Sequence, residues 1–425
     1  MTGRQPTDMA SGRFYDELET RSPDERERQL FADLPGLIAR AIQHAPGAAE
    51  LLKGVAPGDI TSRAALSQLP VLRKSELHDR QKLRPPFGGL TTVEPGKLAR
   101  IFASPGPIYD PEGRRSDYWR FARALFAAGF RAGDVLHNCF SYHLTPAGAM
   151  LESGAQALGC AVIPGGVGQT EVQIRVMSDV RPTGYIGTPS FLKIIFDKAK
   201  ELGTDISSIK KALVAAEALP NSLRAELQSH GCQVLQCYAS ADLGHMAYES
   251  EAREGMIVDE SLIVEILRPG TGHPVPSGEV GEIVVTSFNP DYPLIRFATG
   301  DLSAILPGPS PCGRTNMRIK GWMGRADQSA KVRGMFVHPS QVAEIVRRHP
   351  QVGKARLTID RSGANDIMTL ACEVAGHPAD LAADLAAALA DSIQAVCKLR
   401  GEVKLVAPGS LANDGKVIED IRKFD

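Results

Sequence analysis

The spacing of apolar residues predicts helices and strands in alternation through most of the chain. Ser22-Pro23-Asp24-Glu25 combines an N-cap serine, proline at the first helical position and a capping-box glutamate. Apolar residues then recur at helical spacing at Leu30, Leu34, Leu37, Ile38 and Ile42. Farther on, an apolar segment at 135–140 precedes a helical segment at 147–158, and 161–164 has the pattern of the next strand. Such alternation, from about residue 98 to residue 304, favours an α/β fold with stacked, mainly parallel sheets.

The pattern changes towards the C-terminal end. Residues 282–286 form an apolar β segment that follows the turn residues Gly278 and Gly281. After a proline-rich stretch at 306–311 we expect a short helix from Pro339, strands at 354–361 and 366–374, and an alanine-rich helix with one apolar face made by Leu381, Leu385, Leu389, Ile393 and Val396. We therefore predict a large N-terminal domain with a β subdomain (residues 1–326) and a small α+β C-terminal domain (residues 327–425).

Composition narrows the function classes. The 48 basic and 49 acidic residues are interleaved, which gives no electrostatic argument for a nucleic-acid partner. No apolar run approaches the roughly 20 residues that a membrane span needs, and the first residues include no apolar leader core. The seven cysteines are scattered and lack CxxC pairing, as expected of reduced thiols. We expect a soluble, cytoplasmic protein without a membrane or nucleic-acid partner.

Three short blocks in fixed order carry the strongest functional signal. They are Ala298-Thr299-Gly300-Asp301, then Gly324-Arg325-Ala326-Asp327-Gln328 running into Lys331-Val332-Arg333-Gly334, and finally Gly415-Lys416. Together they supply an acid, several basic groups and glycine turns that could hold a nucleotide and bring a lysine to its phosphate. Such charges suit phosphoryl and nucleotidyl transfer, because charge spreads over oxygens in the transition state.

In the order of these blocks the chain resembles the adenylate-forming enzymes, and most of all their short branch, the phenylacetate-CoA ligases. The resemblance runs from about Phe14 to the C-terminal end. Further segments carry it, namely Leu69-Pro70-Val71-Leu72-Arg73-Lys74, Val162-Ile163-Pro164-Gly165-Gly166, Gly187-Thr188-Pro189-Ser190, Pro293-Leu294-Ile295-Arg296-Phe297 and Val337-His338-Pro339-Ser340-Gln341. It implies the adenylate-forming fold, with the small domain turning on a hinge at Asp327 between an adenylating and a thiolating pose.

The resemblance also assigns roles in the three blocks. Asp301 would accept hydrogen bonds from both ribose hydroxyls, Arg325 and Lys331 would contact the nucleotide, and Lys416 would be the mobile catalytic lysine at the α-phosphate. The structural alternatives are a turn aspartate, a surface Arg–Asp pair and a solvated lysine. A P-loop at Gly409 to Lys416 fails, because Val417 replaces the required Ser or Thr and the glycine spacing is wrong.

Two further segments match nucleotide-contacting parts of the family. In Tyr238-Ala239-Ser240-Ala241-Asp242 the tyrosine would stack on adenine, the serine would meet phosphate, and the acid would hold Mg²⁺ as a catalytic group. Asp242 is one methylene shorter than the family's glutamate, which would call for a water between carboxylate and metal. Ala216 and Glu217 match the family's segment beside the adenine. The alternative for Tyr238 is an ordinary core tyrosine without a role in binding.

The phosphate loop departs from the family. Relatives carry Ser-Gly-Thr-Thr-Gly-x-Pro, whereas Phe102-Ala103-Ser104-Pro105-Gly106-Pro107-Ile108-Tyr109 keeps only Ser104 and Gly106 as candidate phosphate contacts. Its two prolines remove amide donors and stiffen the loop.

The zinc positions depart as well. The family's Cys, His and Cys-x-Cys ligands correspond to Ser250, Ile257, Ser310 and Cys312, so we expect no zinc there. His230, Cys232, Cys237 and His245 lie close in sequence, but free cysteines are usually buried hydrophobes.

The acyl pocket is the least readable part of the sequence. Tyr142, His143, Gly165 and Gly166 match the segments that line it in relatives. His143 could hydrogen-bond a polar ring substituent or lie at the pocket rim without a role.

The resemblance implies an ATP-dependent acid–thiol ligase. It would activate an aromatic or arylacetic carboxylic acid with ATP and Mg²⁺, release AMP, and transfer the acyl group to CoA. Two alternatives stay open: an adenylation protein that loads an acyl carrier protein, and a catalytically weakened nucleotide-binding paralogue with a degenerate phosphate loop. A homodimer is expected from the family and from the prevalence of two-fold oligomers.

Overall fold

The computed structural model describes residues 12–104, 106–326, 328–333, 335–362, 365–376 and 379–422. The chain divides into two compact units. Unit 1 comprises Met1–Val264, Val285–Phe297 and Leu306–Trp322, and unit 2 comprises Glu265–Val284, Ala298–Ile305 and Met323–Asp425. Asp327, the expected hinge, lies outside the described residues, so the division at residues 1–326 and 327–425 stays a prediction.

Unit 1 opens with helices. The predicted N-cap is confirmed, because the Ser22 hydroxyl accepts a hydrogen bond from the Glu25 amide (3.2 Å) at the start of α1 (Pro23–His44). The predicted apolar face of α1 is buried from Leu30 to Ala41. Short helical elements follow: α2 (Pro46–Leu51), α3 (Arg63–Leu66), the 3₁₀ turn η4 (Lys74–Glu76) and α4 (Leu77–Leu83), with η2 (Glu17–Thr20), η3 (Pro57–Asp59) and η5 (Pro95–Lys97) as further turns.

A nine-stranded sheet forms the centre of unit 1, in the order β14-β15-β10-β9-β8-β7-β6-β4-β5. Its parallel half contains β4 (Val135–Asn138), β5 (Ala161–Pro164), β6 (Gly184–Gly187), β7 (Lys211–Val214) and β8 (Gln233–Ser240). An antiparallel extension follows through β9 (Gly244–Tyr248), β10 (Met256–Val258) and β15 (Arg318–Ile319), with β14 (Ile305–Leu306) at the edge.

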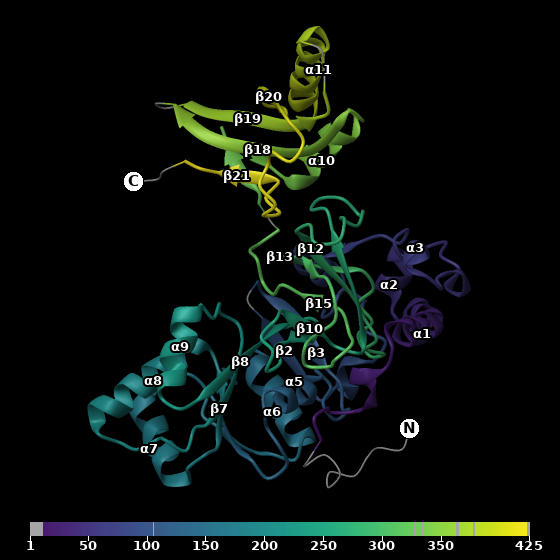
Figure 1. The fold of residues 1–425 in the computed structure, drawn as a ribbon. Helices are drawn as coiled ribbons and strands as arrows, with labels where there is room; N and C mark the ends of the chain where they lie inside the picture. The colour runs from purple at the N-terminus through teal and green to yellow at the C-terminus, as the bar shows by residue number, and fades with distance from the viewer. Residues whose placement is uncertain are drawn as a thin grey trace. The chain divides into compact units, whose positions relative to one another are not determined.

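Helices cover both faces of the parallel half, because successive strand residues point to opposite sides. Ile186 and Leu213 pack in one core with α5 (Phe121–Ala127) and α6 (Ala147–Ala157). Their neighbours Tyr185 and Ala212 pack in another with α7 (Thr170–Val180) and α8 (Pro189–Leu202), and α9 (Asn221–Ser229) adds Leu227 to it. Figure 1 shows α7, α8 and α9 gathered together beside β7 and β8. The alternation predicted from the sequence is thereby confirmed.

Two smaller sheets complete the N-terminal elements. The hairpin of β2 (Arg100–Ser104) and β3 (Ile108–Glu112) pairs Ser104 with Ile108 and Phe102 with Asp110. A four-stranded sheet has the order β1-β13-β12-β11, from β1 (Leu72–Arg73), β13 (Phe297–Ser303), β12 (Gly281–Ser287) and β11 (Leu262–Leu267). Strand β12 coincides with the β segment predicted at 282–286.

The C-terminal part of unit 2 is an α+β body, as predicted. Its sheet has the order β20-β19-β18-β21, from β18 (Val352–Ser362), β19 (Asn365–Val374), β20 (Glu402–Val406) and β21 (Ile418–Asp420). The hairpin β16 (Ala330–Val332) and β17 (Met335–Val337), the helix α10 (Pro339–Arg347) and the helix α11 (Ala379–Cys397) complete it. Leu385, Leu389 and Ile393 of α11 are buried in its core and Val396 packs against it, whereas the side chain of Leu381 lies outside the described ones.

Candidate nucleotide and phosphate site

Asp301, predicted to bind the ribose, and Arg325, predicted to contact the nucleotide, are brought together in unit 2. They form an isolated antiparallel bridge, and Arg325 Nη1 donates to Asp301 Oδ1 at 2.9 Å. Gly300 makes this possible: its φ is +76°, and a Cβ added there would lie 2.7 Å from Arg325 Nη2. An L side chain would therefore be strained and would displace the guanidinium. About half of the Arg325 side chain is exposed, so its remaining donors can reach a ligand.

Lys416 lies on a loop that is fixed by two side chains whose roles the sequence did not predict. Arg356, on β18, donates to the carbonyls of Ala412 (3.2 Å) and Lys416 (3.3 Å) and pairs with Asp414 and Glu419. Gln328 donates to the Gly415 carbonyl at 3.0 Å, and its own carbonyl accepts the amides of Val417 and Ile418. The loop backbone is thus held from both sides.

The lysine side chain on this loop remains accessible. Lys416 Nζ pairs with Glu419 Oε1 at 2.6 Å, and 46% of the side chain is exposed. The hydrogen bond from Lys416 is the main reason that the pKa of Glu419 is lowered. Because this pair is exposed on one side, its rupture costs little and the ammonium can move to another anion. Two other predicted residues cannot be placed, since Asp327 and the side chain of Lys331 lie outside those described.

Asp242 follows the end of β8 and is almost fully buried. Its Oδ2 accepts a hydrogen bond from Lys74 Nζ at 2.6 Å, across 168 residues of sequence. Lys74 belongs to the segment 69–74 that carries the family resemblance, but its role was not predicted. Within β8, Tyr238 is buried, Ala239 is half-buried, and the Ser240 hydroxyl accepts the Leu243 amide (3.2 Å), which shapes the turn that carries Asp242.

Ala216 and Glu217, expected beside the adenine, lie after β7. Ala216 adopts a positive φ of 68°. The Glu217 carboxylate accepts the amide of Ser190 at 3.3 Å, so it contacts the segment 187–190 at the start of α8. This contact links two segments that the family resemblance had singled out separately.

The phosphate segment is a tight hairpin. The Ser104 hydroxyl is buried and donates to the Ile108 carbonyl at 3.2 Å, across the turn. The imidazole of His78, on α4, lies 3.0 Å from the Pro107 carbonyl, and Gly106 has a φ of +148°. Gln81 of α4 bonds both backbone groups of Tyr109, its oxygen accepting the amide (2.8 Å) and its amide donating to the carbonyl (2.9 Å). The hairpin is therefore fixed by α4.

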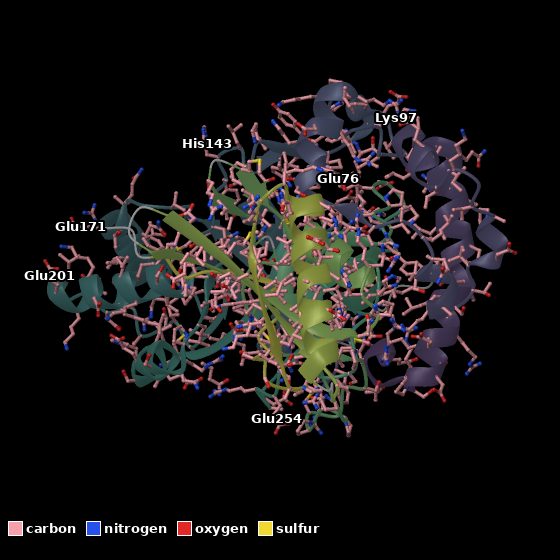
Figure 2. The ribbon with its side chains drawn as sticks, turned by 90° about the horizontal axis from the view of Figure 1, so that it is seen from above. Glu76, Lys97, His143, Glu171, Glu201 and Glu254 are labelled. Carbon is pink, nitrogen blue, oxygen red and sulfur yellow. The ribbon has the colours of Figure 1, made fainter. Side chains whose placement is uncertain are left out.

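The residues expected at the acyl pocket lie around the end of β4. The Tyr142 hydroxyl accepts from Asn138 Nδ2 at 2.9 Å, and burial, followed by the nearby Glu152, raises its pKa. Gly165 lies against His137: a Cβ there would be 2.5 Å from His137 Nε2. Gly166 has a φ of +68° and donates its amide to the Asn138 carbonyl (2.9 Å). His143 is exposed, and Figure 2 shows it near the upper left edge of the drawn side chains.

Comparison with known proteins places this geometry in a family. Residues 118–289 match the family model "AMP-binding enzyme", and residues 334–421 match "AMP-binding enzyme C-terminal domain". Phenylacetate-coenzyme A ligase of Aromatoleum evansii is 30% identical over 84% of this chain and 83% of the relative. The enzymes of that name from Thermus thermophilus and Escherichia coli are 31% and 30% identical, over 85% and 86% of this chain and 84% and 86% of the relatives. The chain belongs to the phenylacetate-CoA ligase-like branch of the adenylate-forming enzymes.

A solved structure supports the fold of this phenylacetate-CoA ligase-like chain. A 2-hydroxyisobutyryl-CoA ligase in the postadenylation state, in complex with R3-HIB-AMP, is 24% identical. It matches with a TM-score of 0.72 over 99% of this chain and 94% of that chain. The adenylate-forming fold expected from the sequence is confirmed. Among the helices that the structure describes, none combines the length and apolar character needed to cross a membrane.

The positions matched to the family's zinc ligands are filled here by other contacts. Ser310 Oγ and Cys312 Sγ lie 3.1 Å apart, Arg314 Nη1 lies 3.6 Å from the same sulfur, and Ile257 is buried. The four His and Cys residues that are close in sequence do not form one cluster: His230 stacks on Phe196, whereas Cys232 and Cys237 belong to different cores. No three His, Cys, Asp or Glu side chains within the described ranges could hold a metal ion together.

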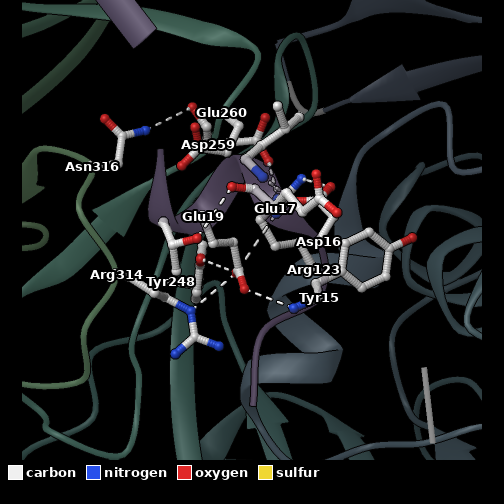
Figure 3. A network of polar contacts seen from close by, with 12 residues as sticks. Tyr15, Asp16, Glu17, Glu19, Arg123, Tyr248, Asp259, Glu260, Arg314 and Asn316 are labelled. Atoms are coloured by element: carbon white, nitrogen blue, oxygen red, sulfur yellow. Dashed lines mark hydrogen bonds and ion pairs between the residues drawn. The ribbon is translucent and has the colours of Figure 1, made fainter. Parts of the chain in front are cut away.

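Next to these positions lies a buried polar network that ties η2 to the central sheet (Figure 3). Glu19 is its centre: Oε1 accepts from Arg314 Nε (3.0 Å) and from the Tyr248 hydroxyl (2.6 Å), and Oε2 accepts the Tyr15 amide (2.7 Å). Arg123 pairs with Asp16 at 2.7 Å. Since Glu19 and Arg314 are almost fully buried, charged hydrogen bonds hold this network together.

Proposed function

We propose that this protein is an AMP-forming acid–CoA ligase that activates an aromatic or arylacetic carboxylate. Membership of the phenylacetate-CoA ligase-like branch supports the reaction class. The single observation that carries the proposal is the Asp301–Arg325 pair, which places an acceptor and a guanidinium fork side by side where the family holds ribose. Two further groups support it: the buried carboxylate of Asp242 and the accessible side chain of Lys416, which lies on a fixed loop.

In the first half-reaction the substrate carboxylate oxygen attacks the α-phosphorus of ATP, and the bond to pyrophosphate breaks. Asp301 accepts the ribose hydroxyls and Arg325 donates to the nucleotide, which fixes the α-phosphate relative to the carboxylate. Lys416 exchanges Glu419 for the reacting oxygens and neutralises the charge that develops on them. A bound Mg²⁺ supplies further neutralisation of phosphate charge. Asp242 fits such a cation, because its Oδ1 is buried and has no hydrogen-bond partner among the described groups.

In the second half-reaction the thiol of CoA attacks the acyl carbonyl, and AMP leaves with the electrons of the broken C–O bond. Tyr142, His143, Gly165 and Gly166 are the proposed lining of the acyl pocket. His137 and Gln173 fill the space that a Cβ at Gly165 would need, whereas the space beside Gly166 is open, and Tyr142 is held in place by Asn138.

The competing function is a nucleotide-binding paralogue without catalysis. It is favoured by one observation: the Ser104 hydroxyl, expected to grip phosphate, donates instead to the Ile108 carbonyl within the hairpin. The two functions differ in whether pyrophosphate is released when a carboxylic acid is supplied.

The deciding experiment is pyrophosphate release from Mg-ATP with a panel of aryl and arylacetic acids, with and without CoA. We expect release with at least one acid and faster turnover when CoA is added. Release that CoA does not accelerate would point to an acyl carrier protein as acceptor. No release with any acid, while ATP binding is retained in calorimetry, would overturn the proposed ligase.

The lysine gives a residue-level prediction for the same assay. Lys416→Ala should lower acid-dependent pyrophosphate release by about a hundredfold to a thousandfold, because it removes a charge aimed at the transition state. Thioester formation from a supplied acyl-adenylate should change far less. Lys404→Ala, at an exposed lysine on β20, is the matched control and should leave both rates unchanged. Equal losses in both half-reactions would contradict the assigned role.

A further inference from the structure

Beside Asp242 lies a second buried carboxylate that the proposed mechanism does not use. Asp110 on β3 has no exposed surface. Neither of its oxygens has a hydrogen-bond partner within the described part of the chain, and the same holds for Asp242 Oδ1. The hydroxyl of Tyr292, buried and likewise without a partner there, completes the group. We call these three side chains the hairpin cluster.

The members of the hairpin cluster lie close enough for their charges to interact. Burial, followed by the charge of Asp242, raises the pKa of Asp110 well above its usual range. Burial and then the charges of Asp110 and Asp242 raise the pKa of the Tyr292 phenol. The phenol therefore lies within electrostatic range of both carboxylates.

Only one basic side chain, Lys74, donates a hydrogen bond to the hairpin cluster in the described structure. Lys74 Nζ bonds Asp242 Oδ2 (2.6 Å) and leaves the other three carboxylate oxygens without a donor in the described structure. An unpaired buried carboxylate is costly, because it loses its hydration and gains nothing in exchange. A small hard cation satisfies this arrangement, since carboxylate oxygens are its preferred ligands.

The position of Asp110 connects the cluster to the phosphate hairpin. Phe102 pairs with Asp110 and Ser104 pairs with Ile108, so the side chains of Asp110 and Ser104 lie on the same face of the hairpin. Ser104 is the residue expected to meet phosphate, and its hydroxyl is close enough to oppose the rise in the Asp110 pKa. A cation held by Asp110 and Asp242 would lie on the hairpin face that carries Ser104.

We propose that Asp110 and Asp242 together bind one divalent cation at the base of the phosphate hairpin, with the Tyr292 hydroxyl donating to a carboxylate oxygen or to a water on the metal. The cation presents its remaining coordination positions to ATP phosphates and replaces the threonine hydroxyls and amides that the hairpin lacks. This use in ATP binding rests on the proposed function; the cation site itself does not.

The test is Mn²⁺ binding to the full-length protein, followed by electron paramagnetic resonance and calorimetry, first without nucleotide and then with a non-hydrolysable ATP analogue. We expect one Mn²⁺ per chain, and Mg²⁺ should displace it. Asp110→Asn should weaken Mn²⁺ binding at least about tenfold, since even the loss of an outer-shell partner commonly costs that much. Mn²⁺ binding by Asp110→Asn that equals the wild type under both conditions would overturn the proposal.

Glu112→Gln is the matched control. Glu112 lies two residues farther along the same strand and is also buried, but both of its oxygens accept from Arg100 (3.2 and 3.1 Å). Its Mn²⁺ binding should equal that of the wild type. An equal loss in Glu112→Gln and Asp110→Asn would show that the hairpin had merely been perturbed, and would count against the site.

The melting temperature in EDTA and in Mg²⁺ tests the cation site independently of nucleotide binding. In EDTA, Asp110→Asn should melt no lower than the wild type, because it removes a buried carboxyl group whose oxygens have no hydrogen-bond partner in the described structure. On addition of Mg²⁺ the melting temperature of the wild type should rise and that of Asp110→Asn should not. A melting temperature that Mg²⁺ leaves unchanged in the wild type would contradict the site. Mn²⁺ binding without pyrophosphate release for any acid would retain the cation site and reject the proposed ligase.

Discussion

Two buried polar groups in unit 1 contrast in how their charges are satisfied. In the network of Figure 3, Glu19 accepts three hydrogen bonds, and Glu260 accepts from Arg26 (2.7 Å) and Arg21 (3.1 Å). In the hairpin cluster, Asp110 and Asp242 share a single described hydrogen bond, from Lys74. Both groups are equally removed from solvent, so burial alone does not account for the difference.

The contrast separates a structural role from a binding role. A fully paired network gains nothing from a ligand, and it joins η2 and α1 to the central sheet in a fixed arrangement. A cluster with unpaired oxygens beside a phosphate hairpin gains much from a cation. We expect the stability of the first group to be independent of metal and that of the second to depend on it.

The largest expected effect is in the satisfied network. Glu19→Ala removes the buried carboxylate that pairs with Arg314 and leaves only the more distant, exposed Glu251 (3.7 Å); breaking such a buried pair costs about 3–5 kcal/mol in the free energy of unfolding. Urea unfolding should give the same loss in EDTA and in Mg²⁺. Glu94→Ala, at an exposed glutamate outside this network, is the control and should change stability by less than about 0.5 kcal/mol. If Mg²⁺ restored the free energy of unfolding that Glu19→Ala loses, the contrast between the two groups would be wrong.

The sequence could predict elements whose signals are local. The cap at Ser22 and the apolar spacing of α1 depend on neighbouring residues, and the strand–helix alternation follows from periodicity. The order of the blocks around Asp301, Arg325 and Lys416 was readable because the resemblance spans nearly the whole chain. Of these, the structure joins Asp301 to Arg325 directly.

Contacts made between distant segments could not be predicted. Lys74 meets Asp242 across 168 residues, and no local pattern indicates that pairing. Asp110 carries no motif, and its isolation from hydrogen-bond donors exists only once β3 is packed against α4. Arg356 lies within the strand predicted at 354–361, and no sequence pattern indicates that its guanidinium fixes the loop of Lys416. Packing, which decides these pairings, is set by the whole fold.

An intermediate loss of stability is expected when acid protonates Asp259. Its carboxylate, like that of Glu19, is buried beside basic side chains. Burial raises its pKa, but the adjacent His245 (Nδ1 to Oδ2, 3.6 Å) and the charges of Arg120 and Arg123 outweigh burial and lower the pKa from 3.8 to about 2. The folded state therefore releases this proton more readily than the unfolded state. The resulting stabilisation, about 2 kcal/mol, is fully present above about pH 4 and is lost as pH falls towards 2.

The measurement compares urea unfolding of the wild type and Asp259→Asn from pH 7 to the lowest pH at which both are folded. The wild type should be more stable by about 2 kcal/mol at pH 7, and the difference should narrow below about pH 4. Mg²⁺ should not alter this difference. A difference that stays constant down to pH 3 would show that the Asp259 carboxylate is not stabilised by its charge.

The smallest effect concerns Lys74, the one described donor to the hairpin cluster. Lys74→Met removes an ion pair whose lysine is about a quarter exposed but whose carboxylate is fully buried, so without metal we expect the free energy of unfolding to fall by at least about 1 kcal/mol. Because Asp242 then lacks any cation, Mg²⁺ should raise the melting temperature of the variant more than that of the wild type. Lys82→Met, at an exposed lysine on α4, should show the wild-type response. If Lys74→Met instead abolishes the rise in melting temperature on addition of Mg²⁺, the Lys74 ammonium is needed to position the carboxylates for the metal. The hairpin cluster would then depend on its ion pair, as the network around Glu19 does.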